Sequence, residues 1–273
     1  MTYFNNLGQG RVGFKTPSGG GVDADALAFI TAVAITGTTQ QNAIITLVTQ
    51  LKTYGIWGKM KAIYPFVGGT ASTHKWNLKD PRDLDAAYRL VFNGGGTHTS
   101  TGYKGNGSNG YANTFISPSS TLTANNIHFS YYNRTNGSEE RYDIGATLSS
   151  PTRSIVAALS WYDASANRVF FSISSNEKDI VNTDPRKFFI ANKTTAGSLS
   201  GFINTTKTTY AVTDSTLPTI PMFINARNVN GANDLASSKE CAFASIGDGL
   251  TDTEAANFYS AVQSFNTTLT RQI

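Results

Sequence analysis

The sequence has little of the chemistry on which disulfides, metal sites and many active sites are built. Cys241 is the only cysteine among 273 residues, which excludes an intrachain disulfide. In its apolar stretch a lone thiol is expected to be a small core residue. His74, His98 and His128 are the only histidines and lie far apart, without the short spacing typical of zinc sites. We therefore expect structural or exposed histidines, no metal site and no other cofactor.

Charge and long apolar runs are also scarce. Charged residues make up 15% of the chain, against about 25% in average globular domains. The 22 basic and 18 acidic residues give a net charge of +4. The basic residues are scattered, so nucleic acid is not an expected partner. No segment reaches the roughly 18 apolar residues of a membrane span. The first residues lack a signal-peptide pattern, so we expect a protein made in the cytoplasm without export.

One stretch near the C-terminus, Cys241 to Tyr259, predicts a strand followed by a tight turn and a helix. From Cys241 to Ile246, Cys, Phe and Ser alternate with Ala, Ala and Ile, which suits the two faces of a strand. Gly247-Asp248-Gly249 supplies the turn. We expect the helix to begin directly after this turn.

The predicted C-terminal helix has a start signal and one apolar face. Thr251 or Asp252 can cap it, and Glu254 follows Thr251 by three residues, as in a capping box. Apolar residues then recur at helical spacing, at Phe258, Val262 and Phe265. This stripe requires a surface on which to pack.

Residues 1–66 are predicted to form an N-terminal arm and a helical collar that attaches or oligomerises the protein. Helices are expected from Asp23 or Asp25 to about Val33 and from Thr38 to Gly55, and a third, short helix over residues 56–63. An apolar stripe on the second helix either contacts another copy of the chain or packs on its own domain; its members are Ile44, Leu47, Val48 and Leu51.

Residues 67–273 are predicted to form one mainly β domain. Gly, Ser, Thr and Asn are abundant, which is typical of many short strands joined by polar turns. Eight such strands indicate a sandwich. The candidate strands are residues 108–115, 126–133, 141–148, 154–162, 168–174, 201–212, 222–228 and 240–246.

Several short segments in this region carry a family resemblance. They are Asn106 to Ala112, Ile246-Gly247, Leu250-Thr251-Asp252-Thr253-Glu254 and Phe258-Tyr259. In this order they resemble the laminin-G-like branch of the concanavalin A-like lectin and glucanase fold, over about residues 88–265. The resemblance implies a concanavalin A-like jelly-roll sandwich with a small helical N-terminal region and a C-terminal helix.

A second resemblance covers the N-terminal part. Gly10-Arg11-Val12-Gly13, residues 60–69 and residues 74–81 are similar to virion structural proteins of bacteriophages, particularly those of Bacteroidetes-type hosts. This resemblance implies a component of a phage particle. A concanavalin A-like domain on a particle implies, by analogy, a surface module that touches host glycans or decorates the shell, although a fold alone does not establish function.

The sequence contains no recognisable motif for glycoside hydrolysis or for calcium binding. Glycoside hydrolases of this fold place two carboxylates on one strand, often as Glu-x-Asp-x-x-Glu, and no such spacing occurs here. We therefore expect no catalytic residues and no enzyme. The acidic residues of two polar loops are expected to be solvated: Glu139, Glu140, Glu177, Asp179 and Asp184. The laminin-G-like resemblance leaves calcium binding open, without a recognisable loop, at Asp143, Asp163, Asp234 and Asp248.

Sugar binding requires an exposed aromatic face together with polar groups that reach hydroxyls. Two groups of residues at strand ends meet this description. Because alternate residues of a strand face inward, at least half of their aromatic rings are expected in the core. The candidates are Tyr131, Tyr132, Asn133 and Arg134 in one group and Trp161, Tyr162 and Asp163 in the other.

Together the two resemblances imply a phage virion structural protein on the particle surface. It would be a receptor-binding, spike or fibre component that recognises host glycans. The expected partners are other virion proteins, a host-cell glycan and further copies of the chain, and a trimer is favoured because particle proteins are usually symmetric oligomers. Two alternatives remain open: a capsid or tail decoration protein without a ligand, and a carbohydrate-active enzyme.

Overall fold

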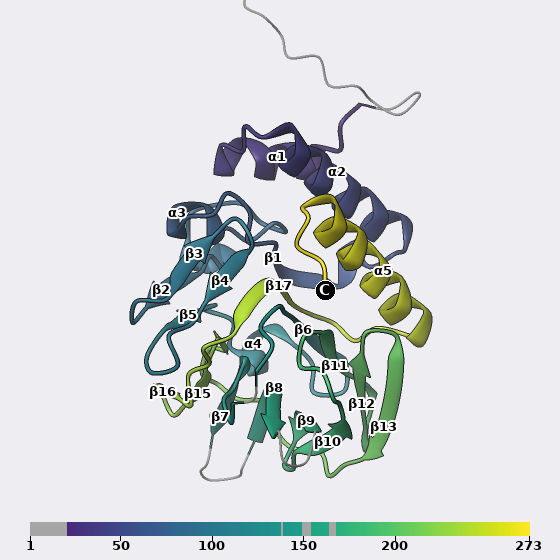
Figure 1. Cartoon of the computed structure of the whole chain (residues 1–273). Coiled ribbons are helices and arrows are strands. Elements are labelled where there is room, and N and C mark those ends of the chain that lie inside the picture. Colours follow the sequence, from purple (N-terminus) through teal and green to yellow (C-terminus); the bar gives the residue numbers. More distant parts are fainter. Residues whose placement is uncertain (1–20, 138, 149–153, 164–167) are drawn as a thin grey trace, which may run out of the picture.

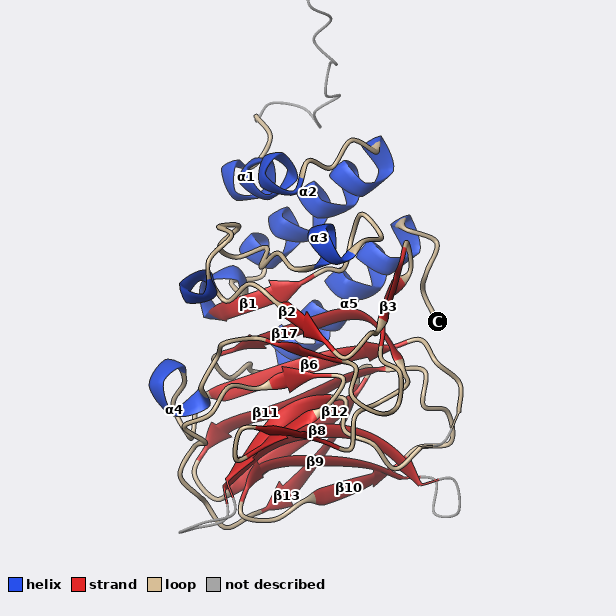
Figure 2. Cartoon of the chain, turned by 90° about the vertical axis from the view of Figure 1, so that its left-hand side faces the viewer, coloured by secondary structure: helices blue, strands red, loops and turns tan. Residues whose placement is uncertain are grey.

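Two β-sheets stack face to face, and a layer of helices covers the outer face of one of them (Figures 1 and 2). The computed structural model describes residues 21–137, 139–148, 154–163 and 168–273, and the side chains of residues 154–163 lie outside this description. The mainly β, concanavalin A-like jelly-roll sandwich predicted from the sequence is confirmed.

The sheet next to the helices, here called the central sheet, has eight strands. Seven of them are ordered β13 (Thr206–Ala211), β12 (Ser198–Ile203), β11 (Phe188–Thr195), β6 (Ile127–Asn133), β17 (Glu240–Gly247), β4 (Gly102–Lys104) and β3 (Thr97–Thr99). The eighth, β1 (Met60–Tyr64), pairs antiparallel with β17.

The other sheet, here called the outer sheet, has nine strands. Seven are ordered β10 (Lys178–Val181), β9 (Arg168–Ser174), β8 (Ser154–Asp163), β7 (Ile144–Leu148), β14 (Phe223–Ile224), β5 (Tyr111–Asn113) and β2 (Val91–Asn93). A short hairpin of β15 (Arg227–Val229) and β16 (Ala232–Asp234) joins this sheet where β15 runs parallel to β7.

The helical layer consists of α1 (Ala24–Val33), α2 (Thr38–Thr53) and α5 (Asp252–Thr268). Smaller helices lie in the connections: α3 (Ala71–His74), α4 (Pro118–Thr121), and the 3-10 turns η1 (Trp57–Lys59) and η2 (Asp85–Ala87). Among the described residues, no helix combines the length and apolar character needed to cross a lipid bilayer.

The central sheet is buried on both faces. Along β11, Phe189 and Ala191 belong to the core between the sheets, whereas Phe188 and Ile190 belong to the core beneath the helices. Apolar residues on both faces remove the period-two alternation that marks a half-buried strand. For this reason the sequence pattern does not predict β11.

Three of the four predicted helices are confirmed. The Asp23 carboxylate caps α1 by accepting hydrogen bonds from the backbone N–H groups of Asp25 and Ala26. Thr251 and Glu254 form the predicted capping box of α5. α2 ends at the residue before Tyr54, close to the predicted end.

The third predicted helix, over residues 56–63, is wrong. The chain forms only the turn η1 there and continues as β1, whose residues Ala62 and Ile63 pair with Ile246 and Ser245 of β17. Pairing with a buried strand outweighs a weak local helix preference.

Two strand predictions also require correction. Residues 201–212 form parts of two strands, because β12 and β13 make a hairpin whose turn contains Asn204 in the left-handed region, with φ of 55°. Asn tolerates this conformation better than most residues. Residues 222–228 contain the short strand β14 and the start of β15.

The apolar stripe of α2 packs within the chain. Its side chains are all 0% exposed and share one core with the stripe of α5 and the outer face of the central sheet. The intrachain alternative is therefore correct for this stripe. The boundary predicted between residues 66 and 67 runs through this shared core, since α1, α2 and β1 all contribute to it. The core beneath the helices includes Ile44, Leu47, Val48, Leu51, Phe258, Val262 and Phe265.

A buried arginine fixes the C-terminal end. Arg271 is 0% exposed and donates hydrogen bonds of 2.6 to 2.9 Å to the carbonyls of Pro65, Phe66 and Ala242 and to the side chain of Asn266. Burial lowers the pKa of this guanidinium to about 9. The side chain ties α5 and β17 to the loop after β1 by donating to neutral oxygens.

Folding brings two distant histidines together. The Nδ1 atoms of His74 and His98 lie 3.1 Å apart, and Nε2 of His74 accepts a hydrogen bond from the backbone N–H of Gly69 at 3.2 Å. His74 is 1% exposed, and its burial, together with the nearby His98 and Arg271, lowers its pKa to about 3. The sequence spacing gave no sign of this pair.

The third histidine joins β6 to the end of β17. In His128, Nδ1 lies 2.5 Å from the carbonyl oxygen of Asp248 and Nε2 lies 3.2 Å from Oγ of Ser245. The side chain is fully buried, and burial lowers its pKa to about 4. His74 and His128 are therefore structural, as the sequence predicted.

We expect mild acid to destabilise the fold through these two histidines. In the unfolded chain their pKa is near 6.5, so between pH 6.5 and about 4 the unfolded chain binds protons that the folded chain does not. The free energy of unfolding should then fall by about 1.4 kcal/mol per pH unit for each histidine. Urea unfolding at several pH values measures this slope. His128→Gln should reduce the slope by about 1.4 kcal/mol per pH unit, and an unchanged slope would contradict the assignment.

Candidate functional site

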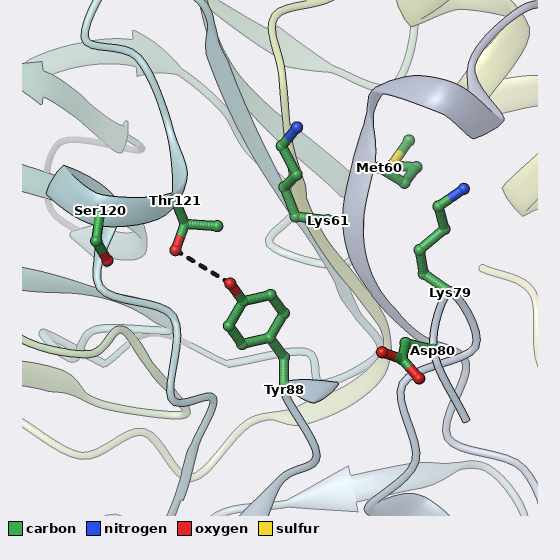
Figure 3. Close-up of a pocket in the computed structure, with 7 residues that line it drawn as sticks. All are labelled: Met60, Lys61, Lys79, Asp80, Tyr88, Ser120 and Thr121. Carbon is green, nitrogen blue, oxygen red and sulfur yellow. Dashed lines mark hydrogen bonds between the residues drawn. The ribbon is translucent and has the colours of Figure 1, made fainter. Parts of the chain in front are cut away.

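A groove open to solvent lies between β1, the loop that contains Lys79 and the helix α4 (Figure 3). Its volume is about 530 Å³. Two ammonium groups, one carboxylate, one aromatic ring and several hydroxyls line it, which are the kinds of group that recognise a hydroxylated ligand. The lining residues are Met60, Lys61, Lys79, Asp80, Tyr88, Ser120 and Thr121.

A buried asparagine holds the walls of the groove together. Asn77 is 0% exposed. Its Nδ2 donates to the carbonyls of Lys61 and Ala87 at 3.2 and 3.0 Å, and its Oδ1 accepts from the backbone N–H groups of Ile63 and Lys79 at 2.9 and 3.0 Å. A side-chain amide offers two N–H donors and two acceptor lone pairs. Asn77 uses all four to join β1 to both segments that follow it.

Tyr88 supplies the aromatic ring of the groove. Figure 3 shows the ring between Asp80 and the α4 residues, with its hydroxyl directed toward Thr121, 3.3 Å away. The backbone has φ of 60°, a left-handed conformation that is uncommon for residues other than glycine. The hydroxyl of the buried Tyr64 donates to the Tyr88 carbonyl at 2.8 Å and helps to hold it there.

The two lysines of the groove differ in their partners. Lys61 forms an ion pair with Asp248 at 3.0 Å. The Lys79 Nζ lies 4.3 Å from the ring centroid of Trp57, and in the part of the chain that the structure describes it forms no ion pair with a carboxylate. Burial lowers the pKa of Lys79; the nearby Asp25 opposes this shift, and Lys52 and Lys61 add to it. Lys79 is therefore the cation best placed to pair with a group on a ligand.

Asp80 is the carboxylate of the groove. Arg82 donates to both of its oxygens, at 2.7 and 2.5 Å, and this bonding holds the pKa of Asp80 below its ordinary value. The carboxylate is thus ionised at neutral pH and accepts hydrogen bonds. Its backbone N–H donates to the Asn77 carbonyl, which closes the turn that carries both Lys79 and Asp80.

The first predicted sugar-binding group is buried. Tyr131 and Tyr132 are each 1% exposed and Asn133 is 0% exposed. The tyrosine hydroxyls donate to the side chains of Asn225 and Gln263. The expectation of an exposed aromatic face here is wrong, because β6 lies in a sheet that is covered on both faces.

The rest of the predicted group is also engaged within the fold. The Asn133 amide donates to the Pro185 carbonyl at 2.7 Å. Arg134 donates to the Glu240 carboxylate at 2.5 Å and to the Arg271 carbonyl at 2.7 Å. These contacts fix the end of β6 and leave no polar platform beside an exposed ring.

The second predicted group lies on β8. Trp161, Tyr162 and Asp163 belong to this strand, but their side chains lie outside the described residues. Their role in sugar binding stays a prediction.

The candidate calcium ligands take part in ion pairs. Asp143 pairs with Lys239, Asp234 with Arg227, and Asp248 with Lys61, while the side chain of Asp163 lies outside the description. Within the described ranges, no three His, Cys, Asp or Glu side chains gather where they could hold a metal ion.

Two further predictions have clear outcomes. Cys241 is 0% exposed and its burial raises the pKa of the thiol, so the core-thiol prediction is confirmed. Glu139 is not a solvated residue, because its carboxylate accepts hydrogen bonds from the hydroxyls of Ser237 and Ser238 and from the Ser238 backbone N–H.

The sandwich fold also occurs in a solved structure of low sequence identity to this chain. No protein family model matches the chain, and no curated protein sequence matches it. A mutant of Trypanosoma rangeli sialidase that displays trans-sialidase activity matches 81% of this chain with a TM-score of 0.53 and 10% identity. The match covers 39% of the sialidase chain.

A second similar structure is domain 4 of AbnA, an extracellular GH43 arabinanase from Geobacillus stearothermophilus, solved in complex with arabinotriose. It matches 73% of this chain and 98% of its own length, with a TM-score of 0.47 and 12% identity. The sialidase match, which has the higher TM-score, supports the sandwich fold alone.

We expect Asn77→Asp to disrupt the groove. The substitution puts a carboxylate oxygen against the carbonyls of Lys61 and Ala87, which then lose their donor. The free energy of unfolding should fall by about 2 to 4 kcal/mol, as measured by urea denaturation. Asn136→Asp, at an exposed position, is the matched control and should change stability by less than about 0.5 kcal/mol. Equal stability of the two variants would show that Asn77 does not hold the walls together.

Proposed function

We propose that the chain is a non-catalytic glycan-binding module and that the groove beside Tyr88 holds the sugar. The observation that carries this proposal is the placement of an aromatic ring among fixed charged groups and hydroxyls on a lectin-like sandwich. An aromatic face contacts the apolar side of a pyranose, while Lys, Asp and hydroxyl groups bond to its hydroxyls. The four hydrogen bonds of Asn77 pre-organise these groups, which lowers the entropic cost of binding.

The same groove supports binding rather than hydrolysis. Glycosidases of the retaining and inverting types place two carboxyl groups on either side of the scissile bond. Asp80 is the one carboxylate among the residues that line the groove, and it is held in a bidentate pair by Arg82. A carboxylate with this partner is a hydrogen-bond acceptor and a poor proton donor.

We further propose that this module acts on the surface of a phage particle, where it recognises glycans of the host cell. The support is the similarity of residues 60–69 and 74–81 to phage virion proteins. These segments contain Lys61, Lys79 and Asp80 of the groove. The resemblance and the candidate site thus fall on the same part of the chain. Other virion proteins and further copies of the chain, with a trimer favoured, are the proposed partners.

A glycan array followed by titration with the best ligand tests the binding site. Lys79→Gln and Asp80→Asn each remove a charged hydrogen-bonding group, so each should weaken binding about tenfold, or about 1.4 kcal/mol. Lys104→Gln, at an exposed lysine of β4, is the matched control and should bind like the unchanged protein. Circular dichroism confirms that each variant is folded.

Three other results have defined meanings. Glycan binding that survives both groove substitutions would place the site elsewhere, with the β8 residues as the next choice. Absence of binding to glycans and host cells, with firm binding to capsid or tail components, would replace receptor binding by decoration. Release of sugar from a bound glycan would make the protein an enzyme.

A further inference from the structure

Lys239 and Asp143 meet in the interior of the sandwich. Lys239 precedes β17 of the central sheet, and Asp143 precedes β7 of the outer sheet. The Lys239 Nζ lies 3.6 Å from Oδ2 of Asp143, and each side chain is 1% exposed. Burying two charges in this way is costly. Transfer of one proton from the ammonium to the carboxylate converts the pair into a neutral amine and a carboxylic acid, which are reactants for an amide.

A second carboxyl group reaches this pair through a hydroxyl. Oγ of Ser237 lies 3.0 Å from Oδ1 of Asp143 and 2.6 Å from Oε1 of Glu139, and it accepts a hydrogen bond from the Lys239 backbone N–H at 3.1 Å. A hydroxyl carries one proton, so it cannot donate fully to two carboxylates at once. If either Glu139 or Asp143 carries a proton, that carboxyl group donates to the Ser237 oxygen while the Ser237 hydroxyl donates to the other carboxylate. Ser237, which is 0% exposed, can therefore relay a proton between Glu139 and Asp143.

Asn225 holds the backbones of Asp143 and Lys239 in place. Its backbone N–H donates to the Asp143 carbonyl at 2.6 Å, and its Nδ2 donates to the Lys239 carbonyl at 2.7 Å. The Tyr131 hydroxyl donates to Oδ1 of Asn225 at 3.0 Å and fixes the orientation of this amide. Reacting groups held at about 3 to 3.5 Å in a fixed geometry gain a large effective concentration. The distance of 3.6 Å from Lys239 Nζ to Oδ2 of Asp143 places the carboxyl group that carries the reacting carbon next to the amine.

We propose that Lys239 and Asp143 condense to form an intramolecular isopeptide bond. The lone pair of the neutral Lys239 Nζ attacks Cγ of Asp143 and forms the C–N bond. The bond from Cγ to Oδ1 then breaks, and this oxygen leaves as water with the carboxylic acid proton and one amine proton. Ser237 contacts the leaving oxygen, and Glu139 on the other side of Ser237 holds one of these two protons and returns it to that oxygen through the Ser237 hydroxyl.

The reaction is balanced and needs no further reactant. One amine and one carboxylic acid give one secondary amide and one water, with no change of oxidation state. Two buried charges are replaced by a neutral amide, which removes the electrostatic cost of the pair. The bond would join the central sheet to the outer sheet and close a covalent loop over residues 143–239. Such a bond would resist separation of the two sheets under force.

The mass of the intact protein tests this proposal directly. The purified full chain should be lighter than its sequence by one water, about 18 Da, and a tryptic digest should contain a branched peptide that joins Lys239 to Asp143. Lys239→Arg keeps the positive charge but has no amine nucleophile of this kind, so it should show the full sequence mass. Asp143→Ala should do the same.

Glu139 has a separate test, because it acts through Ser237. Glu139→Gln should lower the fraction of folded protein that carries the bond at least tenfold after a fixed incubation, and Glu139→Asp should restore part of it. A purely structural role for Glu139 would lower the melting temperature and leave the linked fraction of folded protein unchanged. The proposal is overturned if the folded, unchanged protein keeps its full sequence mass after prolonged incubation and gives only unbranched peptides.

Discussion

The structure depends on the pairing of β17 with three other strands. β17 is bonded to β1, β6 and β4, and its side chains are buried from Cys241 to Gly247. This register fixes β1 and so places Lys61 in the groove. The residue after the strand, Asp248, then binds Lys61, and the residue before it, Lys239, enters the space between the sheets. One strand thus positions both the groove and the buried pair.

Aromatic packing holds α5 onto this strand. Phe188 of β11, Phe243 of β17 and Phe258 of α5 form a triangle of edge-to-face contacts, with ring centroids 5.4 to 6.1 Å apart. Each such pair stabilises a fold by about 0.5 to 1.5 kcal/mol beyond the burial of its area. Arg271 adds hydrogen bonds from the end of the chain to the same region. The helices are therefore an integral layer of the sandwich.

Local signals in the sequence predicted local structure well. Caps at Asp23 and Thr251 located helix starts, and turn residues located most strand ends. The predictions failed where distant segments decide the outcome. β11 lacks alternation because helices cover its second face, β1 forms a strand because β17 is available to pair with it, and Tyr131 and Tyr132 are buried because their sheet has no exposed face. The candidate groove could not be predicted either, because it depends on the contacts of Asn77 with residues up to 16 positions away.

The claim that the Tyr88 groove is the ligand site has one direct test. Hydrogen exchange measured with and without the best glycan from the array reports which backbone amides the ligand protects. If the groove holds the sugar, protection should be concentrated in residues 60–64, 77–88 and 118–121, the segments that form its walls. Protection confined to residues 154–163, with these three segments unchanged, would contradict the claim.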